Sequence, residues 1–155
     1  MIKEFFKYLP GIISAILAAY FTARWSLRKL YSEKWWERKE KAYSEIVEAL
    51  YQVMQYCEIK KDHYEVGKTY SDEKMKEFQD RYSMAYWKLK KATDIGAFVI
   101  SQEGAKVLEE LRSRPKLDWN ENPPWEIYDQ DYEYYKKALE NIVRVAKKDL
   151  KATKA

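Results

Sequence analysis

The stretch "KYLPGIISAILAAYFTARW", from Lys7 to Trp25, carries no charge between Lys7 and Arg24, although 35% of the 155-residue chain is charged. A run of this kind can be a membrane span, a signal peptide or a buried helix of a soluble domain. A bilayer core needs about 20 apolar residues, each rising about 1.5 Å. Phe5 and Phe6 extend the run upstream, and the two flanking cations can reach the lipid headgroups. We therefore predict a membrane span.

A cleavable signal peptide would need a basic start, an apolar region and a small-x-small cleavage site. Lys3 and Lys7 supply the basic start. No pair two residues apart near the end of the run, such as Leu17 and Ala19, is small at both positions. We therefore expect the segment to be retained rather than removed.

The charges on either side of the run predict its orientation. Two lysines precede it, whereas seven cations follow it closely, and the positive-inside rule places the more basic side in the cytoplasm. We predict a single-pass protein of the bacterial inner membrane, with its N-terminus outside and its C-terminal domain in the cytoplasm. The single cysteine, Cys57, agrees with a reducing compartment. The residues predicted to lie at the membrane interface are Lys7, Arg24, Trp25, Arg28 and Lys29.

Small residues recur every fourth position along the span, and positions four apart share a helix face. Rows of this type let two helix backbones approach closely within a bilayer, so the lipid bilayer and a second copy of the chain are the predicted partners. The alternative is that alanine is simply common in helices. One row is Gly11, Ala15, Ala19 and Ala23, and the row beside it is Ser14, Ala18 and Thr22.

The remainder of the chain has the pattern of a helical bundle. No Gly or Pro falls between Ile12 and Val66, so the span can continue directly into the next helix. The predicted fold is all-α, with an N-terminal transmembrane helix continuing into a four-helix bundle. We divide it into an anchor over residues 1–30 and a cytoplasmic bundle over residues 31–155. The apolar stripe of the first bundle helix is Trp36, Tyr43, Ile46, Leu50, Val53 and Cys57.

Three further helices are predicted from their caps and breaks. Ser71 and Ser101 are N-cap residues of the second and third helices, and the run Ala97–Ile100 between them is expected to form a buried corner. A proline-containing loop then precedes the last helix. The apolar positions of these helices are Met75, Phe78, Tyr82, Ala85, Tyr86, Leu89, Val107, Leu108, Leu111, Tyr128, Tyr132, Tyr135, Leu139, Ile142, Val143 and Ala146.

Residues that commonly carry out catalysis are scarce. His63 is the only histidine, and its neighbours in sequence predict a solvated side chain. Asp129, Asp131 and Glu133 could bind a cation, but acids near a helix start are more often there for the helix dipole. We expect no enzyme activity, no metal, no other cofactor and no small-molecule substrate.

Nucleic acid is kept as an alternative partner. The net charge of +4 is too balanced to indicate it. Trp35 and Trp36 beside Arg38 and Lys39 could stack on bases, although interface anchoring or the bundle core is the preferred use of these tryptophans.

The stretches "EKWWERKEKAYSEIVEAL", "KATDIGAFVISQEGAKVLEEL" and "PPWEIYDQDYE" resemble a bacterial family of small, uncharacterised membrane-anchored proteins. The resemblance covers most of residues 33–151 and implies no activity, although some such proteins accompany phage-defence loci. The architecture is also similar to the membrane accessory protein of type VI-B CRISPR systems, a span followed by a HEPN-like bundle that assembles into a pore. HEPN nucleases use Arg-x-x-x-x-His, whereas Glu58 lies five residues before His63.

These observations predict a non-enzymatic, self-associating inner-membrane protein that acts as a scaffold, sensor or pore component, with antiphage defence as the favoured setting. A membrane-tethered enzyme or nucleic-acid-binding helical module is the first alternative. A soluble bundle whose first helix packs into its own core is the second.

Overall fold

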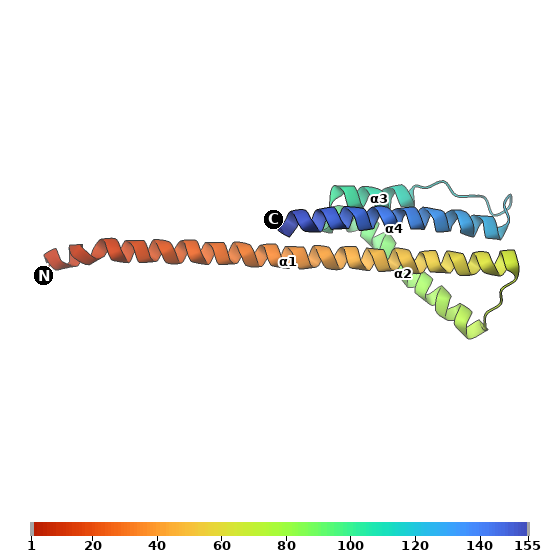
Figure 1. The fold of residues 1–155 in the computed structure, drawn as a ribbon, viewed down its shortest axis with the longest axis horizontal. Helices are drawn as coiled ribbons and strands as arrows, with labels where there is room; N and C mark the ends of the chain where they lie inside the picture. The colour runs from red at the N-terminus through yellow and green to blue at the C-terminus, as the bar shows by residue number, and fades with distance from the viewer. Residues whose placement is uncertain (1, 155) are drawn as a thin grey trace. The chain divides into compact units, whose positions relative to one another are not determined.

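The computed structural model describes the backbone of residues 2–154, and the side chains of residues 16–152 except Ala97. Within this part the chain forms four helices and no strand, which confirms the all-α prediction (Figure 1). The helices are α1 (Ile2–Val66), α2 (Asp72–Val99), α3 (Gln102–Arg112) and α4 (Pro124–Lys154). The chain divides into two compact units, the first ending at Glu37 and the second beginning at Arg38.

Helix α1 is 65 residues long, as the absence of Gly and Pro after Ile12 predicts. It ends where Gly67 takes a positive φ of 70°, a conformation that glycine adopts without the steric cost of a Cβ. The next amide N–H, that of Lys68, donates to the carbonyl of Asp62 at 3.4 Å. This bond satisfies one of the carbonyls that a helix end leaves without an intrahelical partner.

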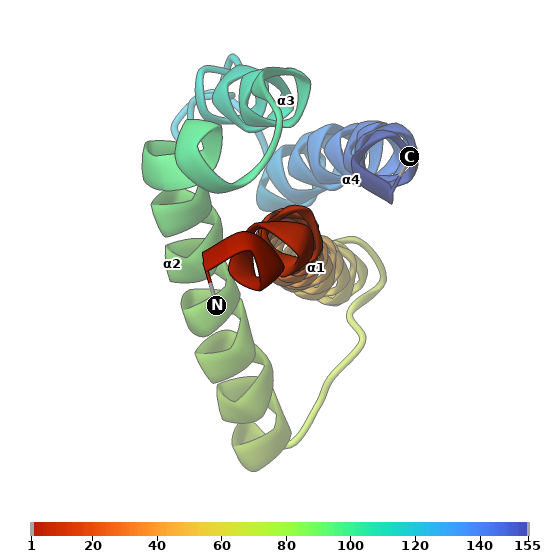
Figure 2. The same ribbon diagram turned by 90° about the vertical axis from the view of Figure 1, so that its left-hand side faces the viewer.

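The second unit packs the part of α1 after Glu37 with α2, α3 and α4 around one apolar core (Figure 2). Helix α4 runs antiparallel to this part of α1, and α3 lies beside α4 (Figure 1). All four helices contribute, and every member of the predicted stripe of α1 is buried in this core except Trp36, which is half-buried. The most buried members of the core are Tyr43, Ala49, Leu50, Val53, Cys57, Ala85, Leu108, Ile142 and Val145.

The junction of α2 and α3 is formed by Ile100 and Ser101. Ser71 and Ser101 cap the two helices as predicted, each accepting an amide N–H with its side-chain oxygen. The predicted corner over Ala97–Ile100 is too long, because α2 continues to Val99 and only Ile100 forms the buried turn. Glycine costs a helix about 1 kcal/mol, and packing at Gly96, which is buried, outweighs that cost.

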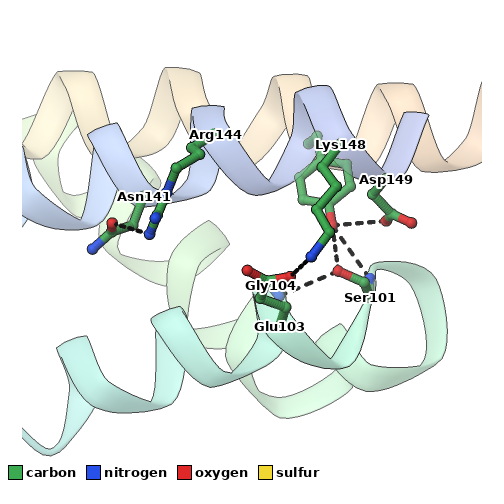
Figure 3. Close-up of polar contacts among 8 residues, drawn as sticks. Ser101, Glu103, Gly104, Asn141, Arg144, Lys148 and Asp149 are labelled. Atoms are coloured by element: carbon green, nitrogen blue, oxygen red, sulfur yellow. Dashed lines mark hydrogen bonds and ion pairs between the residues drawn. The ribbon is translucent and has the colours of Figure 1, made fainter. Parts of the chain in front are cut away.

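A polar network fixes the start of α3 against α1 and α4. The Tyr43 hydroxyl donates to Oδ2 of Asp149 at 2.9 Å and accepts from the Ser101 amide at 3.3 Å. Its oxygen lies 3.0 Å from the Ser101 hydroxyl, which accepts from the amide of Gly104 (Figure 3). Lys39 donates to the other oxygen of Asp149 at 3.0 Å. Burial raises the pKa of Tyr43, so this phenol stays neutral at physiological pH and can donate.

The first unit has a different surface. Every residue from Ile16 to Trp35 is exposed, including Phe21 at 65% and Trp25 at 79%. No helix in the described part of the chain has the length and apolar character needed to cross a bilayer. The first half of the predicted span, over residues 8–15, lies outside the residues whose side chains are described.

Candidate functional site

A cavity of about 470 Å³ lies in the second unit, between α2, the end of α3, the loop that follows α3, and the first turns of α4. We call it the tyrosine cavity. Tyr56 of α1 and the apolar side chains Leu89, Leu108 and Leu111 form part of its floor. Cavities of this size hold small ligands in many proteins. Six aromatic side chains line it: Tyr56, Tyr82, Tyr86, Trp119, Tyr128 and Tyr135.

The aromatic side chains pack on one another in a chain of ring contacts. The rings of Tyr56 and Tyr82 stack with centroids 4.3 Å apart, and the ring of Tyr86 lies 6.1 Å from that of Tyr82. On the α4 side, Trp119 meets Tyr128 edge to face at 5.6 Å. Aromatic pairs at such separations stabilise a structure beyond the area they bury. The packed rings therefore form a pre-organised wall.

Burial makes the phenols of this wall even harder to ionise than an ordinary tyrosine, which is already neutral at pH 7. It raises the pKa of Tyr82 and Tyr128, and it raises the pKa of Tyr135 to about 12 against the opposing effect of Arg114. At neutral pH these side chains offer uncharged ring faces and hydroxyl groups that can donate. The wall therefore carries no negative charge that would repel an anion.

Arg114 fixes the loop between α3 and α4 onto the bundle. Its Nε and Nη2 donate to Oδ1 of Asp131 at 2.9 and 2.8 Å, and Nη1 donates to the carbonyl of Leu111 at 3.0 Å. Its guanidinium also lies 4.8 Å from the centre of the Tyr135 ring. The side chain of Arg114 is only 10% exposed. It therefore positions the cavity wall, and its charge stands close to the cavity.

The same loop presents Trp119 at the cavity. Asp118 holds the turn, since its side chain accepts from the amide of Asn120 at 2.8 Å and its carbonyl accepts from the amide of Asn122 at 3.0 Å. An aspartate that bonds to a backbone amide two residues on stabilises a turn. Trp119 remains 57% exposed while lining the cavity, so one part of its ring is open to a ligand.

The lining of the tyrosine cavity is basic. The described residues that form it include four cations and one carboxylate, that of Asp131. Asp131 is paired with Arg114. Arg112 pairs with Asp94 and Glu109, which lie outside the lining. The four cations are Lys90, Arg112, Arg114 and Lys116.

A second hollow lies between α1 and α2. Its volume is about 540 Å³, and its floor is aliphatic, formed by side chains such as Ile46 and Val99. It lacks aromatic lining residues in the described part of the chain. Its charged rim consists of Arg38, Lys41, Glu45, Lys88 and Lys91.

The predicted self-association rows are only partly described. Gly11, Ser14 and Ala15 lie outside the residues whose side chains are described. The remaining members are exposed, and the hydroxyl of Thr22 donates to the carbonyl of Ala18 at 2.8 Å. The other members of this exposed part are Ala19 and Ala23.

The residues predicted to lie at the membrane interface are also only partly described. Lys7 lies outside the described side chains, and Trp25, Arg28 and Lys29 are exposed. Arg24 is also exposed and donates to the hydroxyl of Tyr20 at 3.1 Å.

Four other residues singled out in the sequence, His63, Cys57, Trp35 and Trp36, line neither of the two hollows. The ring nitrogen Nδ1 of His63 lies 3.0 Å from the carbonyl of Lys68, at the end of α1 and outside both hollows. Cys57 is buried in the core, and burial raises the pKa of its thiol to about 12, so it is protonated at neutral pH. Trp35 is 40% exposed, and Trp36 is half-buried.

The acids after Trp125 form ion pairs. Asp129 accepts from Lys61 at 2.6 Å, Asp131 is held by Arg114, and Glu133 lies 3.7 Å from Lys136. In the part of the chain that was described, no three His, Cys, Asp or Glu side chains gather where they could hold a metal ion.

The sequence alone does not predict the tyrosine cavity. The helical pattern predicts Tyr82, Tyr128 and Tyr135 as apolar positions. Tyr135 lies in the core, and the other two are partly buried against it. For the segment that carries Arg114 and Trp119, the sequence predicts only a loop. The signal that was available is composition. Fourteen tyrosines and six tryptophans are more amphipathic aromatics than one small core needs.

No protein-family model matches the sequence, and neither the curated proteins nor the solved structures yielded a significant match.

Proposed function

We propose that this chain is a non-enzymatic, single-pass protein of a bacterial inner membrane, anchored by residues 7–25 and self-associating through the small-residue rows. Its helical bundle lies in the cytoplasm and acts as a scaffold, sensor or pore component. The observation that supports the proposal is the surface of residues 16–23. None of these residues is charged, and all of them are exposed.

The exposed apolar surface of this segment is costly in water. Each Å² of apolar surface left in water costs roughly 25 cal/mol, and the segment exposes Ile16, Leu17 and Phe21 at 51–65%. A core helix of a soluble bundle buries one face, whereas no face of residues 16–23 is buried. A bilayer or a second copy of the chain would cover this surface.

The polar groups of the segment are compatible with an apolar environment. The Thr22 hydroxyl donates to the Ala18 carbonyl within the same helix, so it needs no water. Beyond it, Trp25, Arg28 and Lys29 are residue types that prefer the boundary between bilayer and water.

Fractionation tests the anchor. The full chain should pellet with membranes and resist carbonate extraction, and a C-terminal alkaline phosphatase fusion should be inactive because that enzyme needs the periplasm. A green fluorescent protein fusion at the same position should be fluorescent and serves as the expression control. Release by carbonate would overturn the span, and an active phosphatase fusion would overturn the orientation.

Crosslinking in mild detergent tests self-association. Leucine at positions 15 and 19 (Ala15→Leu with Ala19→Leu) fills the small-residue groove while the segment stays apolar, so insertion should persist and the oligomer should weaken. The control is Ile12→Leu with Ile16→Leu, which retains the bulk of the other face. An oligomer of equal size in both double variants would assign assembly to the bundle instead.

The setting in antiphage defence stays a prediction, and the nature of neighbouring genes would test it. The alternative of a tethered enzyme predicts that His63→Ala abolishes the biological effect without unfolding the bundle. We expect that variant to retain function, because His63 contacts the end of its own helix rather than either hollow. A tethered binding module is supported by a separate observation, the tyrosine cavity.

A further inference from the structure

The tyrosine cavity combines two kinds of surface that are rarely placed together by core packing alone. One is an aromatic wall, of which Trp119 and Tyr86 remain 57% and 42% exposed. The other is a set of cations, of which Lys90 and Lys116 are exposed. Aromatic rings that only pack in a core are covered by neighbouring side chains and have little exposed area. Here two rings line the cavity and keep part of their surface open.

The ring contacts indicate the shape of an occupant. Tyr82 stacks on Tyr56 and its ring lies near that of Tyr86, and the rings of Trp119 and Tyr128 meet edge to face. A flat ring system would add to this series by stacking on an exposed ring. Stacking of a base on one aromatic side chain contributes about 1–3 kcal/mol, which is roughly a 5- to 150-fold gain in affinity.

The charges indicate that the occupant is an anion. The one carboxylate among the described lining residues, Asp131, accepts two hydrogen bonds from Arg114. Arg112 is paired with two carboxylates outside the lining. The other two lining cations, Lys90 and Lys116, take part in neither of these pairings. The Nζ of Lys90 lies 4.7 Å from the ring centre of Trp87, a residue outside the cavity lining. A phosphate bearing one or two negative charges would meet lysine ammonium groups, which bind phosphate as point charges.

We propose that the tyrosine cavity binds a nucleotide, whose base stacks on the exposed aromatic side chains and whose phosphate meets Lys90 and Lys116. The volume of about 470 Å³ lies in the range of small-ligand sites. The nucleotide is either free or an exposed residue of a single strand. The proposal concerns the bundle alone, so it does not rest on the membrane anchor proposed above.

Calorimetric titration of the full chain in mild detergent tests the proposal with four probes. Adenosine 5′-monophosphate carries both the base and the phosphate, adenosine lacks the phosphate, and inorganic phosphate lacks the base. An oligomer of adenylate with blocked ends supplies the same chemistry within a strand. We expect the monophosphate or the oligomer to bind at least tenfold more tightly than adenosine or inorganic phosphate. Preference for the monophosphate identifies a free nucleotide, and preference for the oligomer identifies a strand.

Two sets of variants connect the binding to the cavity. Lys90→Gln with Lys116→Gln should weaken the monophosphate or the oligomer about tenfold or more and leave adenosine unchanged. Trp119→Ala should weaken both the charged probe and adenosine. The matched controls are Lys91→Gln, which removes a charge next to Lys90 on α2 but lines the other hollow, and Trp125→Ala, which removes a neighbouring tryptophan outside the cavity lining. The controls should bind as wild type does.

The result that overturns the proposal is absence of binding by both the monophosphate and the oligomer at millimolar concentration. Binding that the two cavity variants leave unchanged, or that the controls weaken equally, would overturn it as well. Far-ultraviolet circular dichroism of each variant verifies the fold. All of the changed side chains are exposed, including that of Trp125 at 38%, so we expect native spectra.

Discussion

Two stretches of the same helix, residues 16–35 and residues 43–57 of α1, have similar apolar content and opposite surroundings. The first exposes every residue, including Leu27 at 53% and Leu30 at 46%. The second places Leu50 and Val53 at 0% exposure in the core. Apolar content therefore does not tell which part of α1 stabilises the folded bundle. The neighbours that the other helices supply decide it.

The largest expected difference is between two leucines of α1. Leu50→Ala opens a space in a packed core and should lower the free energy of unfolding by about 2–5 kcal/mol. Leu27→Ala removes the same atoms from an exposed position and should change it by less than about 0.5 kcal/mol. Urea unfolding in mild detergent, followed by circular dichroism, measures both. Equal losses would show that residues 16–35 belong to the same cooperative core.

Two ion pairs, one largely buried and one more exposed, allow the same comparison between buried and exposed contacts for charged side chains. Arg114→Met leaves Asp131 without its guanidinium in a partly buried setting, so we expect a loss of about 2–4 kcal/mol in unfolding free energy. Lys61→Met removes the partner of Asp129, and this pair is 33% and 43% exposed, so the expected loss is below about 1 kcal/mol. Thermal unfolding ranks the two variants. A larger loss for Lys61→Met would contradict the assignment of Arg114 as the anchor of the loop.

Much of the bundle could be predicted from sequence because its signals are local. Ser71 and Ser101 each sit directly before an apolar periodic run, and an N-cap serine acts only on the first turn after it. The stripe from Tyr43 to Cys57 repeats at helical spacing and is buried as predicted. The predicted corner after Gly96 is too long because tertiary packing outweighs the weak helix propensity of one glycine.

The tyrosine cavity could not be predicted, because its parts are brought together by contacts distant in sequence. Tyr82 and Tyr128 are 46 positions apart, and a helical stripe indicates only that each faces inward. Arg114 pairs with Asp131 across a loop that contains Pro115 and Pro123, and no spacing rule connects such a pair. The small-residue rows remain a prediction, since Gly11, Ser14 and Ala15 lie outside the described side chains.

Replacing Gly104 or Gly96 by alanine adds one methyl group, and the two positions differ in the space available for it. A Cβ on Gly104 would lie 3.0 Å from the Tyr43 hydroxyl and 3.1 Å from Cδ1 of Ile100, and Tyr43 is held by its hydrogen bonds. Gly104→Ala should therefore lower the unfolding free energy by about 1–3 kcal/mol. At Gly96 the nearest atom would be 3.6 Å away, so Gly96→Ala should raise it by about 0.5–1 kcal/mol through helix propensity.

Urea unfolding of the two glycine variants side by side gives the sign of each change. A stabilised Gly104→Ala variant would mean that the Tyr43 side chain can shift without cost. The polar network at the start of α3 would then not hold that side chain in place.

The smallest expected effect concerns the pair that lies beside this network but is open to water. Lys148 Nζ donates to Oε2 of Glu103 at 2.9 Å, and the two side chains are 75% and 51% exposed (Figure 3). This hydrogen bond holds the pKa of Glu103 below its ordinary value. A carboxyl whose pKa is lower in the folded state binds fewer protons there than in the unfolded state. Its contribution to stability is therefore present above the unfolded pKa and is lost as the pH falls through the folded pKa.

A double-mutant cycle of Glu103→Gln and Lys148→Met isolates this contribution from the effect of Glu103 on the start of α3. We expect a small favourable coupling near pH 7 that disappears once Glu103 is protonated, and that salt at about 1 M also removes, because exposed charges are screened. The coupling is obtained from the free energy of unfolding of the four proteins, measured near pH 7 and at a pH where Glu103 is protonated, each at low salt and at about 1 M salt. A coupling that persisted at low pH and high salt would mean that this pair is shielded from water like Tyr43 and Asp149. Exposure would then be a poor guide to which contacts stabilise the bundle, and the contrast between the two stretches of α1 would need another cause.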